Sequence, residues 1–360
     1  MRYLVTGGGG FLGGRLAREL LSRGEDVRVL GRHDYPDLAA AGAECHVGDI
    51  RDSQAVKAAS RGCDGIFHVA ARAGVWGDRQ EYFSINVRGT ANVLQACLEE
   101  KVTRLVYTSS PSVVFDMARL DIENGDESLP YPKRYAAVYP ESKARAEKMV
   151  LAANGWDIVV GDDGVSRPRV ERLATCALRP HLIWGTGDPH LAPRIVNRAK
   201  AGKLKIVGTG KNRISMTHVD NAALGHIQAM AALSADSPVA GQAYFINDPE
   251  PVAMWAWINR LLHGAGAKEL DKRVPYRLAW LAGAALEAVH GLFPRLGEPP
   301  MTRFVAAQLA GSHWFTCAKA VRDFGYAPKK DLEEAMKSLI ASFLCLHAGR
   351  RVSDRGGGKT

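Results

Sequence analysis

The chain has 360 residues with a formal net charge of +9, and 46% of its residues are hydrophobic, a composition typical of a folded globular protein. The positive charge is spread along the chain without a basic helix or an alternation of aromatic and basic residues, so we expect no nucleic acid partner. The six cysteines form no Cys-x-x-Cys pair, which argues against a disulfide framework and a metal site. With no secretory signal visible, the sequence therefore predicts a cytoplasmic protein.

The first predicted element is a strand over 2–6, which runs into a glycine-rich turn and then into a helix over 11–22. Glycines at this place let the backbone turn tightly and approach a pyrophosphate, whose charge then lies at the N-terminus of the helix. The order of strand, glycines and helix predicts a dinucleotide-binding turn. The candidate cofactor-binding residues here are Gly7, Gly10, Phe11, Leu12 and Gly13.

Short apolar runs alternate with helical patterns through the first half of the chain, which is typical of a parallel sheet wound on both sides. Further strands are predicted at 27–30, 44–47, 65–69, 103–108 and 173–178, and further helices at 52–60, 80–100 and 140–153. A polar insert over 161–172 is predicted to form an exposed hairpin. We therefore expect an α/β fold, with a Rossmann-type doubly wound parallel sheet over 1–180 to which some later segments return.

After residue 180 the pattern becomes irregular, and helices are predicted near 189–202, 219–233, 253–264, 276–290, 302–310 and 331–346. We expect a smaller, mainly helical substrate-binding lobe over 181–346 and a disordered basic tail over 347–360. The stretch 274–293 is rich in Leu, Ala and Trp. One interpretation is a helix that closes the core or a homodimer interface, and the other is contact with a membrane surface or an apolar substrate.

Two groups of polar residues are candidates for chemistry. The strand over 103–108 runs into Ser109 and Ser110, at the edge of the sheet where ligands gather, and a hydroxyl there can donate to a substrate carbonyl. A simple turn is the alternative. Tyr139 and Lys143 are four residues apart and share one helix face. An ammonium beside the tyrosine would lower its pKa and make proton exchange with a substrate oxygen practical.

The end of the second strand bears on the choice of cofactor. NAD enzymes of this architecture usually carry an acidic residue there, which binds the ribose 2′-hydroxyl. This chain reads Leu30-Gly31-Arg32-His33 instead, so no carboxylate repels a 2′-phosphate and Arg32 can pair with it. NADP is the expected cofactor, NAD is the alternative, and Arg32 is otherwise an ordinary loop residue.

In order and spacing, these elements resemble the extended short-chain dehydrogenase/reductase superfamily. The resemblance implies that Tyr139 exchanges the proton, that Lys143 binds the nicotinamide ribose and tunes the tyrosine, and that Ser110 holds the reacting oxygen. It also implies a helix asparagine at Asn86. The further cofactor contacts that it implies are Asp49 and Ile50 at the adenine, Ala70 and Ala71 beneath the ribose, and Pro180 against the nicotinamide.

Three other segments narrow the resemblance to the 3β-hydroxysteroid dehydrogenase family: Thr108–Phe115, Asp126–Pro130 and His218–Ala222. The family implies an oxidoreductase that interconverts a 3-hydroxyl and a 3-oxo group on a large apolar molecule. Two branches of it look similar, the bacterial 2-alkyl-3-oxoalkanoate reductases and the sterol-4-carboxylate 3-dehydrogenases. The segments Ala71–Gly77, Leu182–Asp188 and Gly297–Phe304 are similar to the first branch.

Two other functions are open on the same fold. A nucleotide-sugar epimerase or dehydratase needs polar and basic contacts for a sugar diphosphate, whereas the stretch 274–293 suits an apolar guest. An NADP-binding redox sensor without turnover would need none of the three candidate catalytic residues.

Overall fold

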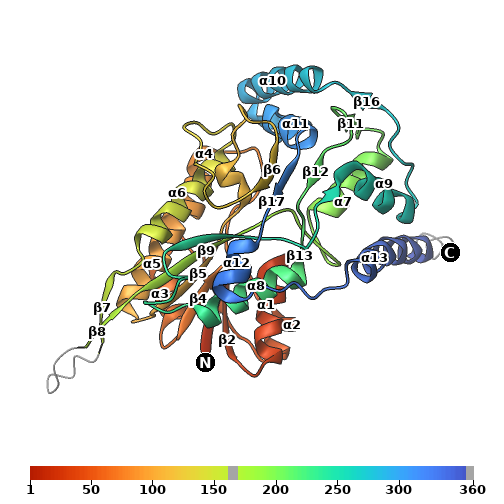
Figure 1. Ribbon diagram of the computed structural model, residues 1–360. Helices are drawn as coiled ribbons and strands as arrows, with labels where there is room; N and C mark the ends of the chain where they lie inside the picture. The colour runs from red at the N-terminus through yellow and green to blue at the C-terminus, as the bar shows by residue number, and fades with distance from the viewer. Residues whose placement is uncertain (161–168, 354–360) are drawn as a thin grey trace.

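The computed structural model describes residues 1–160 and 169–353. At its centre lies a seven-stranded parallel sheet with the order β14-β9-β5-β4-β1-β2-β3 (Figure 1). Most residues of the central strands are buried, as expected for a parallel sheet with helices on both faces. The strands are β1 (Arg2–Thr6), β2 (Asp26–Gly31), β3 (Glu44–Val47), β4 (Gly65–His68), β5 (Arg104–Thr108), β9 (Ala174–Pro180) and β14 (Gln242–Ile246).

Alternate residues of β1 point to opposite faces of the sheet and enter two separate cores. Tyr3 and Val5 pack with helices α1 (Phe11–Ser22) and α8 (Val219–Ala232), whereas Leu4 packs with the helices of the other face. Those helices are α3 (Ser53–Ser60), α5 (Gly89–Glu99) and α6 (Val138–Ala152). The strand order reverses beside β1, so the carboxyl ends of β1 and β4 flank the crevice in which this architecture binds ligands.

The second, smaller layer contains a four-stranded sheet with the order β15-β12-β17-β6. Its strands are β6 (Ile122–Gly125), β12 (Arg213–Ile214), β15 (Val252–Ala253) and β17 (His313–Phe315). The pair β10 (Ile183–Trp184) and β13 (Thr217–His218) and the pair β11 (Ile206–Val207) and β16 (Arg273–Val274) stand beside it. The larger helices of this layer are α7 (Leu191–Lys200), α9 (Met254–Gly264), α10 (Tyr276–Leu292), α11 (Arg303–Ala310) and α13 (Leu332–Ser353).

The predicted fold class, a doubly wound parallel sheet of the Rossmann type, is confirmed. The helix predicted over 80–100 is interrupted: α4 (Arg79–Phe83) is followed by a π-helical turn over Ser84–Arg88 before α5 begins. Two segments beyond residue 180, α8 and β14, return to the large sheet, and α12 (Ala318–Phe324) contacts both of them.

Two predictions concern segments that adjoin residues 161–168 and 354–360, which the structure does not describe. The predicted hairpin has paired antiparallel strands, β7 (Asp157–Val160) and β8 (Arg169–Arg172), and residues 161–168 between them lie outside the described residues. Helix α13 extends to Ser353 and so overlaps the start of the tail predicted over 347–360, whose disorder stays a prediction. Residues 354–360 lie outside the described residues.

Candidate active site

The glycine-rich turn after β1 is tighter than any other residue type would allow. Gly7 has a φ of +70°, and its amide bonds to the Leu30 carbonyl at the end of β2. A Cβ at Gly13 would lie 2.3 Å from the Gly7 carbonyl oxygen. Helix α1 follows directly. Its N-cap is Gly10, whose own amide donates to the Gly7 carbonyl, and no side chain among the described residues caps the amides that come next. The turn therefore presents free N–H groups to an anion.

These amides face a cavity of about 950 Å³ that lies beyond the carboxyl ends of β1, β4, β5 and β9. The cavity brings together every candidate catalytic and cofactor-binding residue predicted from the sequence, from Gly7 to Pro180. Shared lining does not test their individual roles, which stay predictions. Asn86 is the exception among the residues singled out, since it does not line the cavity. Its side-chain amide bonds to Arg72 and Ser142 and so joins two segments of the wall.

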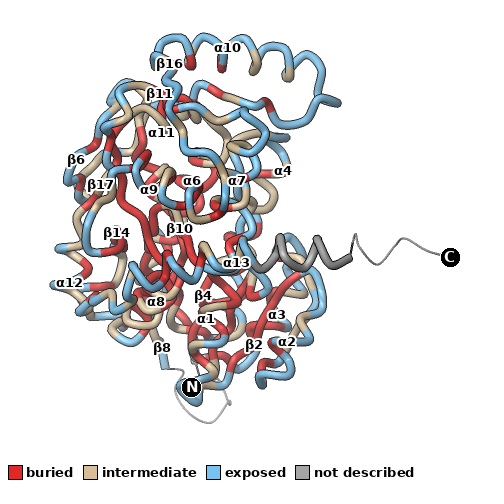
Figure 2. The backbone as a smooth tube through the Cα atoms, turned by 90° about the vertical axis from the view of Figure 1, so that its right-hand side faces the viewer, coloured by how far each residue is buried: buried red, intermediate tan, exposed pale blue. Residues whose placement is uncertain are grey.

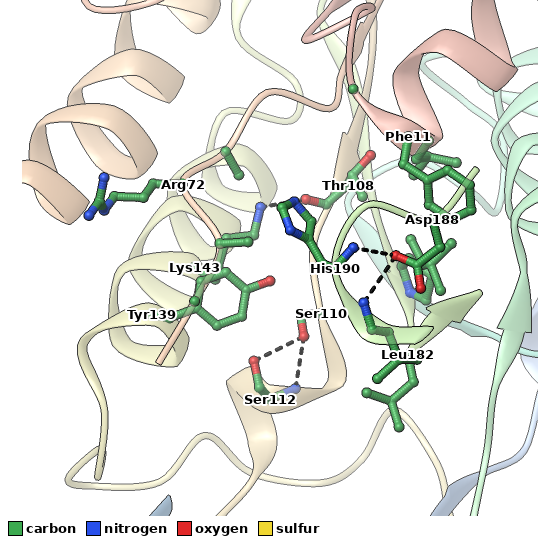
Figure 3. Close-up of a pocket in the computed structure, with 18 of the residues that line it drawn as sticks. Phe11, Arg72, Thr108, Ser110, Ser112, Tyr139, Lys143, Leu182, Asp188 and His190 are labelled. Carbon is green, nitrogen blue, oxygen red and sulfur yellow. Dashed lines mark hydrogen bonds between the residues drawn. The ribbon is translucent and has the colours of Figure 1, made fainter. Parts of the chain in front are cut away.

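Ser110, Tyr139 and Lys143 lie on one side of the cavity (Figure 3). Ser110 follows β5 and caps a short 3₁₀ turn, where its hydroxyl bonds to the Ser112 hydroxyl at 2.9 Å. Tyr139 lies in the first turn of α6 and Lys143 one turn later. Figure 3 shows the hydroxyls of Tyr139 and Ser110 facing the same open space. A carbonyl oxygen placed there would meet two hydroxyl donors.

The Lys143 ammonium loses its proton at a lower pH than an ordinary lysine does. Its side chain is 2% exposed, and burial lowers its pKa to about 7, against the opposing effect of the Glu147 carboxylate. The ammonium donates to the Thr108 carbonyl at 2.6 Å and lies 4.2 Å from the centre of the Tyr107 ring. It is thus held by the end of β5 through a backbone bond and a cation–π contact.

The expectation that Lys143 lowers the pKa of Tyr139 is wrong for this structure. Burial raises the pKa of Tyr139, and the group that opposes this rise is the Ser110 hydroxyl. The reason lies in the direction of the lysine, whose ammonium is bonded at Thr108 instead of at the phenol. The group that lowers the pKa of Tyr139 is therefore Ser110, and not the lysine one helical turn away.

A buried ion pair beneath Lys143 was not foreseen from the sequence. Glu147, one turn beyond Lys143, is bound by Arg179 through two bonds of 3.0 and 2.6 Å, and both side chains are almost completely buried. The Tyr131 hydroxyl donates to the same carboxylate at 2.5 Å. The signal was present in the continuing spacing of four from Tyr139 to Lys143 to Glu147, and in the cation next to Pro180.

The rest of the cavity is an apolar chamber in the smaller layer. Its walls come from three helices, α7, α9 and α11, and from β12. The apolar lining includes Leu191, Ile195, Leu204, Ile214, Met216, Met254, Trp257, Ile258, Phe304, Val305 and Leu309. The stretch 274–293 contributes no residue to this lining. The interpretation that it guides the substrate is therefore not supported by the cavity lining, to which α11 contributes instead.

Within the part of the chain that the structure describes, no cluster of His, Cys, Asp or Glu is suited to hold a metal ion. No helix among those residues is long and apolar enough to cross a membrane.

Comparison with known proteins agrees with this geometry. The 3-beta hydroxysteroid dehydrogenase/isomerase family matches residues 4–278. A 2-alkyl-3-oxoalkanoate reductase of Stenotrophomonas maltophilia is 44% identical over 95% of this chain and 99% of its own length. The sterol-4-alpha-carboxylate 3-dehydrogenase, decarboxylating, of Mus musculus is 33% identical over 94% and 90%.

Solved structures have the same fold. The crystal structure of gox2253 superimposes with a TM-score of 0.73 at 26% identity, covering 95% of this chain and 98% of its own. A dTDP-glucose 4,6-dehydratase from Streptomyces venezuelae with bound NAD has a TM-score of 0.68 at 23% identity, over 96% and 97% of the two chains.

Proposed function

The chain belongs to the 3-beta hydroxysteroid dehydrogenase/isomerase family, and from this membership we propose the reaction of its cavity. The protein is a nicotinamide-dependent oxidoreductase that interconverts a 3-hydroxyl and a 3-oxo group on a bulky apolar substrate. The observation that carries the proposal is the single cavity in which Ser110, Tyr139 and Lys143 meet both the glycine-rich turn and an apolar chamber.

The residues present fit the cofactor. The free amides at the start of α1 suit its pyrophosphate, and a Cβ at Gly7 would lie 2.8 Å from the Cα of Ala70, so only glycine lets these two walls approach each other. The bound cofactor supplies the hydride in reduction and accepts it in oxidation.

In the reduction direction, Tyr139 gives its proton to the substrate oxygen as negative charge develops there, and Ser110 donates a hydrogen bond to the same oxygen. Lys143, whose ammonium is bonded at Thr108 and not at the phenol, would bind the nicotinamide ribose when protonated. Lys143 is buried and Ser110 and Tyr139 are half-buried, which limits the access of water and strengthens each of these interactions. A proton from solvent then restores Tyr139.

For the substrate, we propose a 2-alkyl-3-oxo acid in preference to a neutral sterol. The pocket face of α7 carries two cations, Arg194 and Arg198, among its apolar residues. Arg194 pairs with Glu298, whereas Arg198 donates to the Pro300 carbonyl at 2.8 Å and has no ion-pair partner among the described residues. A substrate carboxylate would complete this site. The higher identity to the 2-alkyl-3-oxoalkanoate reductase supports the same choice.

A matched panel of substrates tests this proposal. Cofactor oxidation is followed with 2-alkyl-3-oxo acids, their methyl esters, 3-oxosteroids and nucleotide sugars. The acids should be reduced, and Arg198→Gln should raise their KM by about tenfold, as expected for loss of a charge-assisted bond, while leaving the KM of the esters unchanged. Turnover of nucleotide sugars alone would favour the epimerase or dehydratase function instead. Binding of cofactor without turnover of any substrate would favour the redox sensor.

For the cofactor, we propose NADP in preference to NAD. The support comes from the end of β2, where the chain itself carries Gly31 and Arg32 on the cavity lining and no acidic residue. Asp49 lines the cavity within electrostatic reach of Arg32, and the Arg51 guanidinium, bonded to Asp49 at 3.0 and 2.6 Å, lowers the pKa of that carboxyl. Its charge is therefore already balanced.

For the surroundings, we propose peripheral contact with a membrane through α10. Its outer face carries exposed apolar side chains, with Leu278 at 57%, Leu281 at 59% and Leu292 at 76% exposure. Arg277 and Arg295 stand exposed beside them and would attract anionic lipid headgroups.

A further inference from the structure

Tyr35 lies across the adenosine end of the cavity in a place that two glycines leave open. A Cβ at Gly9 would lie 1.8 Å from Cε1 of the Tyr35 ring, and a Cβ at Gly31 would lie 2.3 Å from its hydroxyl oxygen. The ring is therefore wedged between the glycine-rich turn after β1 and the last residue of β2. Neither glycine belongs to the Gly7, Gly10, Gly13 spacing, so the pyrophosphate turn does not account for them.

Local structure fixes the ring in this position. Tyr35 immediately precedes α2 (Pro36–Ala40), in which proline at the first position is favourable because it has no N–H to leave unbonded. Leu38, 3% exposed, anchors the helix in the core of the α1 face. Tyr35 packs against the same core and at the same time lines the cavity.

Among the residues that the structure describes, the Tyr35 hydroxyl has no hydrogen-bond partner. The guanidinium of Arg32, which directly follows β2, makes no hydrogen bond or ion pair there, although the Asp49 carboxylate lies within electrostatic reach of it. Both groups line the cavity at Gly31, the position at which an NAD enzyme of this architecture carries its ribose-binding carboxylate. An unpaired hydroxyl donor and an unpaired cation at one point form a site for an anion.

We propose that Tyr35 is a specificity-determining residue of the cofactor site: its ring occupies the space of the missing carboxylate, and its hydroxyl, together with Arg32, binds the 2′-phosphate of NADP. This inference rests on the proposed function. It adds a steric reason for the cofactor choice, because a carboxylate at position 31 and the ring of Tyr35 cannot occupy the same space.

The first test measures binding without catalysis, using adenosine 2′,5′-bisphosphate and 5′-AMP as probes in calorimetric titrations. Wild-type protein should bind the bisphosphate more tightly. Tyr35→Phe keeps the ring and should weaken the bisphosphate about tenfold, the loss typical of a hydrogen bond to a charged acceptor, with 5′-AMP unchanged. Arg32→Gln serves as a reference variant with the same pattern.

The outcomes separate this inference from the proposal on which it rests. If the wild type prefers the bisphosphate and Tyr35→Phe binds both probes as the wild type does, the role of Tyr35 is refuted while the NADP preference stands. Equal weakening of both probes also refutes it, because it shows packing alone. A wild type without preference for the bisphosphate overturns the choice of NADP and this inference together.

A second pair of variants tests the steric part. Gly31→Asp alone should weaken NADH as well as NADPH, because the new side chain displaces the Tyr35 ring. Gly31→Asp combined with Tyr35→Ala removes the obstruction, and NADH affinity should rise at least tenfold above that of the single variant. Thermal unfolding of each variant identifies any that does not fold, and Tyr35→Phe then carries the test. If NADH affinity is the same in the single and the double variant, the steric argument fails.

Discussion

The site beneath Lys143 and the outer face of α10 place side chains in opposite environments. The first buries charged side chains, and the second exposes apolar ones. Under Lys143, the Glu147 carboxylate is held by Arg179 and Tyr131 with bonds of 2.5 to 3.0 Å and has 0% side-chain exposure. On α10, leucines stand in contact with solvent, and the exposed course of this helix is evident in Figure 2. One region fixes charges where water cannot screen them, and the other holds apolar area where water can reach it.

Helix α10 is held to the rest of the protein by its inner face. Helix α10 is attached through its inner face, where Gly283 approaches the backbone of Thr302 so closely that a Cβ would lie 2.7 Å from its carbonyl carbon, and through the Glu287–Arg303 ion pair. Changes on its outer face should therefore leave the fold and the chemistry intact. Changes beneath Lys143 should alter the chemistry, because charges in a low-dielectric site interact strongly.

The largest effect is expected from Tyr139→Phe, which removes the transferable proton and nothing else. The kcat should fall by roughly 10²–10⁴-fold, the range typical of one acid–base group. Cofactor affinity, measured by quenching of protein fluorescence, should stay within about twofold, since the ring is retained. A kcat near that of the wild type would rule out Tyr139 as the proton donor.

The second effect concerns the pH profile. Lys143 is needed as a cation, and with its pKa held at about 7, the cation is lost as the pH rises through that value. Glu147 raises this pKa, so removing its charge lowers it. We expect the alkaline limb of the kcat/KM profile to move to lower pH by about one unit in a Glu147→Gln variant. Activity at pH 8 should fall more than activity at pH 6.

Glu147→Gln also leaves Arg179 buried without its partner, which costs about 3–5 kcal/mol of stability. The double variant Glu147→Gln with Arg179→Met removes both charges and keeps the readout interpretable if the single variant unfolds. Glu141→Gln is the matched control, because Glu141 lies on the same helix but pairs at the surface with Arg79. A uniform loss of activity with an unmoved alkaline limb would show that the ion pair serves packing only.

The sequence predicted the sheet half of the molecule well because its signals are local. The strand β1, the turn from Gly7 to Gly13 and helix α1 follow one another without a gap, and each has its own pattern of residues. Ser109 and Ser110 could be named for the same reason, since parallel strands bring their carboxyl ends to one edge, whereas the cofactor contacts from Asp49 onward were named from the family resemblance.

The helices of the smaller layer were predicted close to their observed bounds, but its sheets could not be predicted in this way. Its strands are two to four residues long and pair across large separations, as when His313 of β17 pairs with Ile122 of β6. So short a run has no period of its own, and its partner is chosen by tertiary packing. The same limit applies to Glu147 and Arg179, which come together only when β9 lies beside α6. It also applies to Tyr35, whose position against Gly9 depends on the tertiary fold.

The smallest effect on the enzyme itself is expected at α10, where Leu278→Asp with Leu281→Asp tests the membrane contact. Both side chains are more than half exposed, so the pair should change the free energy of unfolding by no more than about 0.5 kcal/mol per site. Neither residue lines the cavity, so the KM for dispersed short and long substrates should be unchanged.

The wild type should sediment with vesicles that contain anionic phospholipid. Apolar area buried in the interface stabilises binding by about 25 cal/mol per Å², and Arg277 and Arg295 add attraction to the headgroups. The double variant should remain in the supernatant. Ala279→Asp, on the buried inner face, is the control, and it should lower the melting temperature. If the wild type also stays in the supernatant, α10 has no membrane role, and loss of a dimer in the double variant, measured by analytical ultracentrifugation, would assign its exposed face to a second copy of the chain.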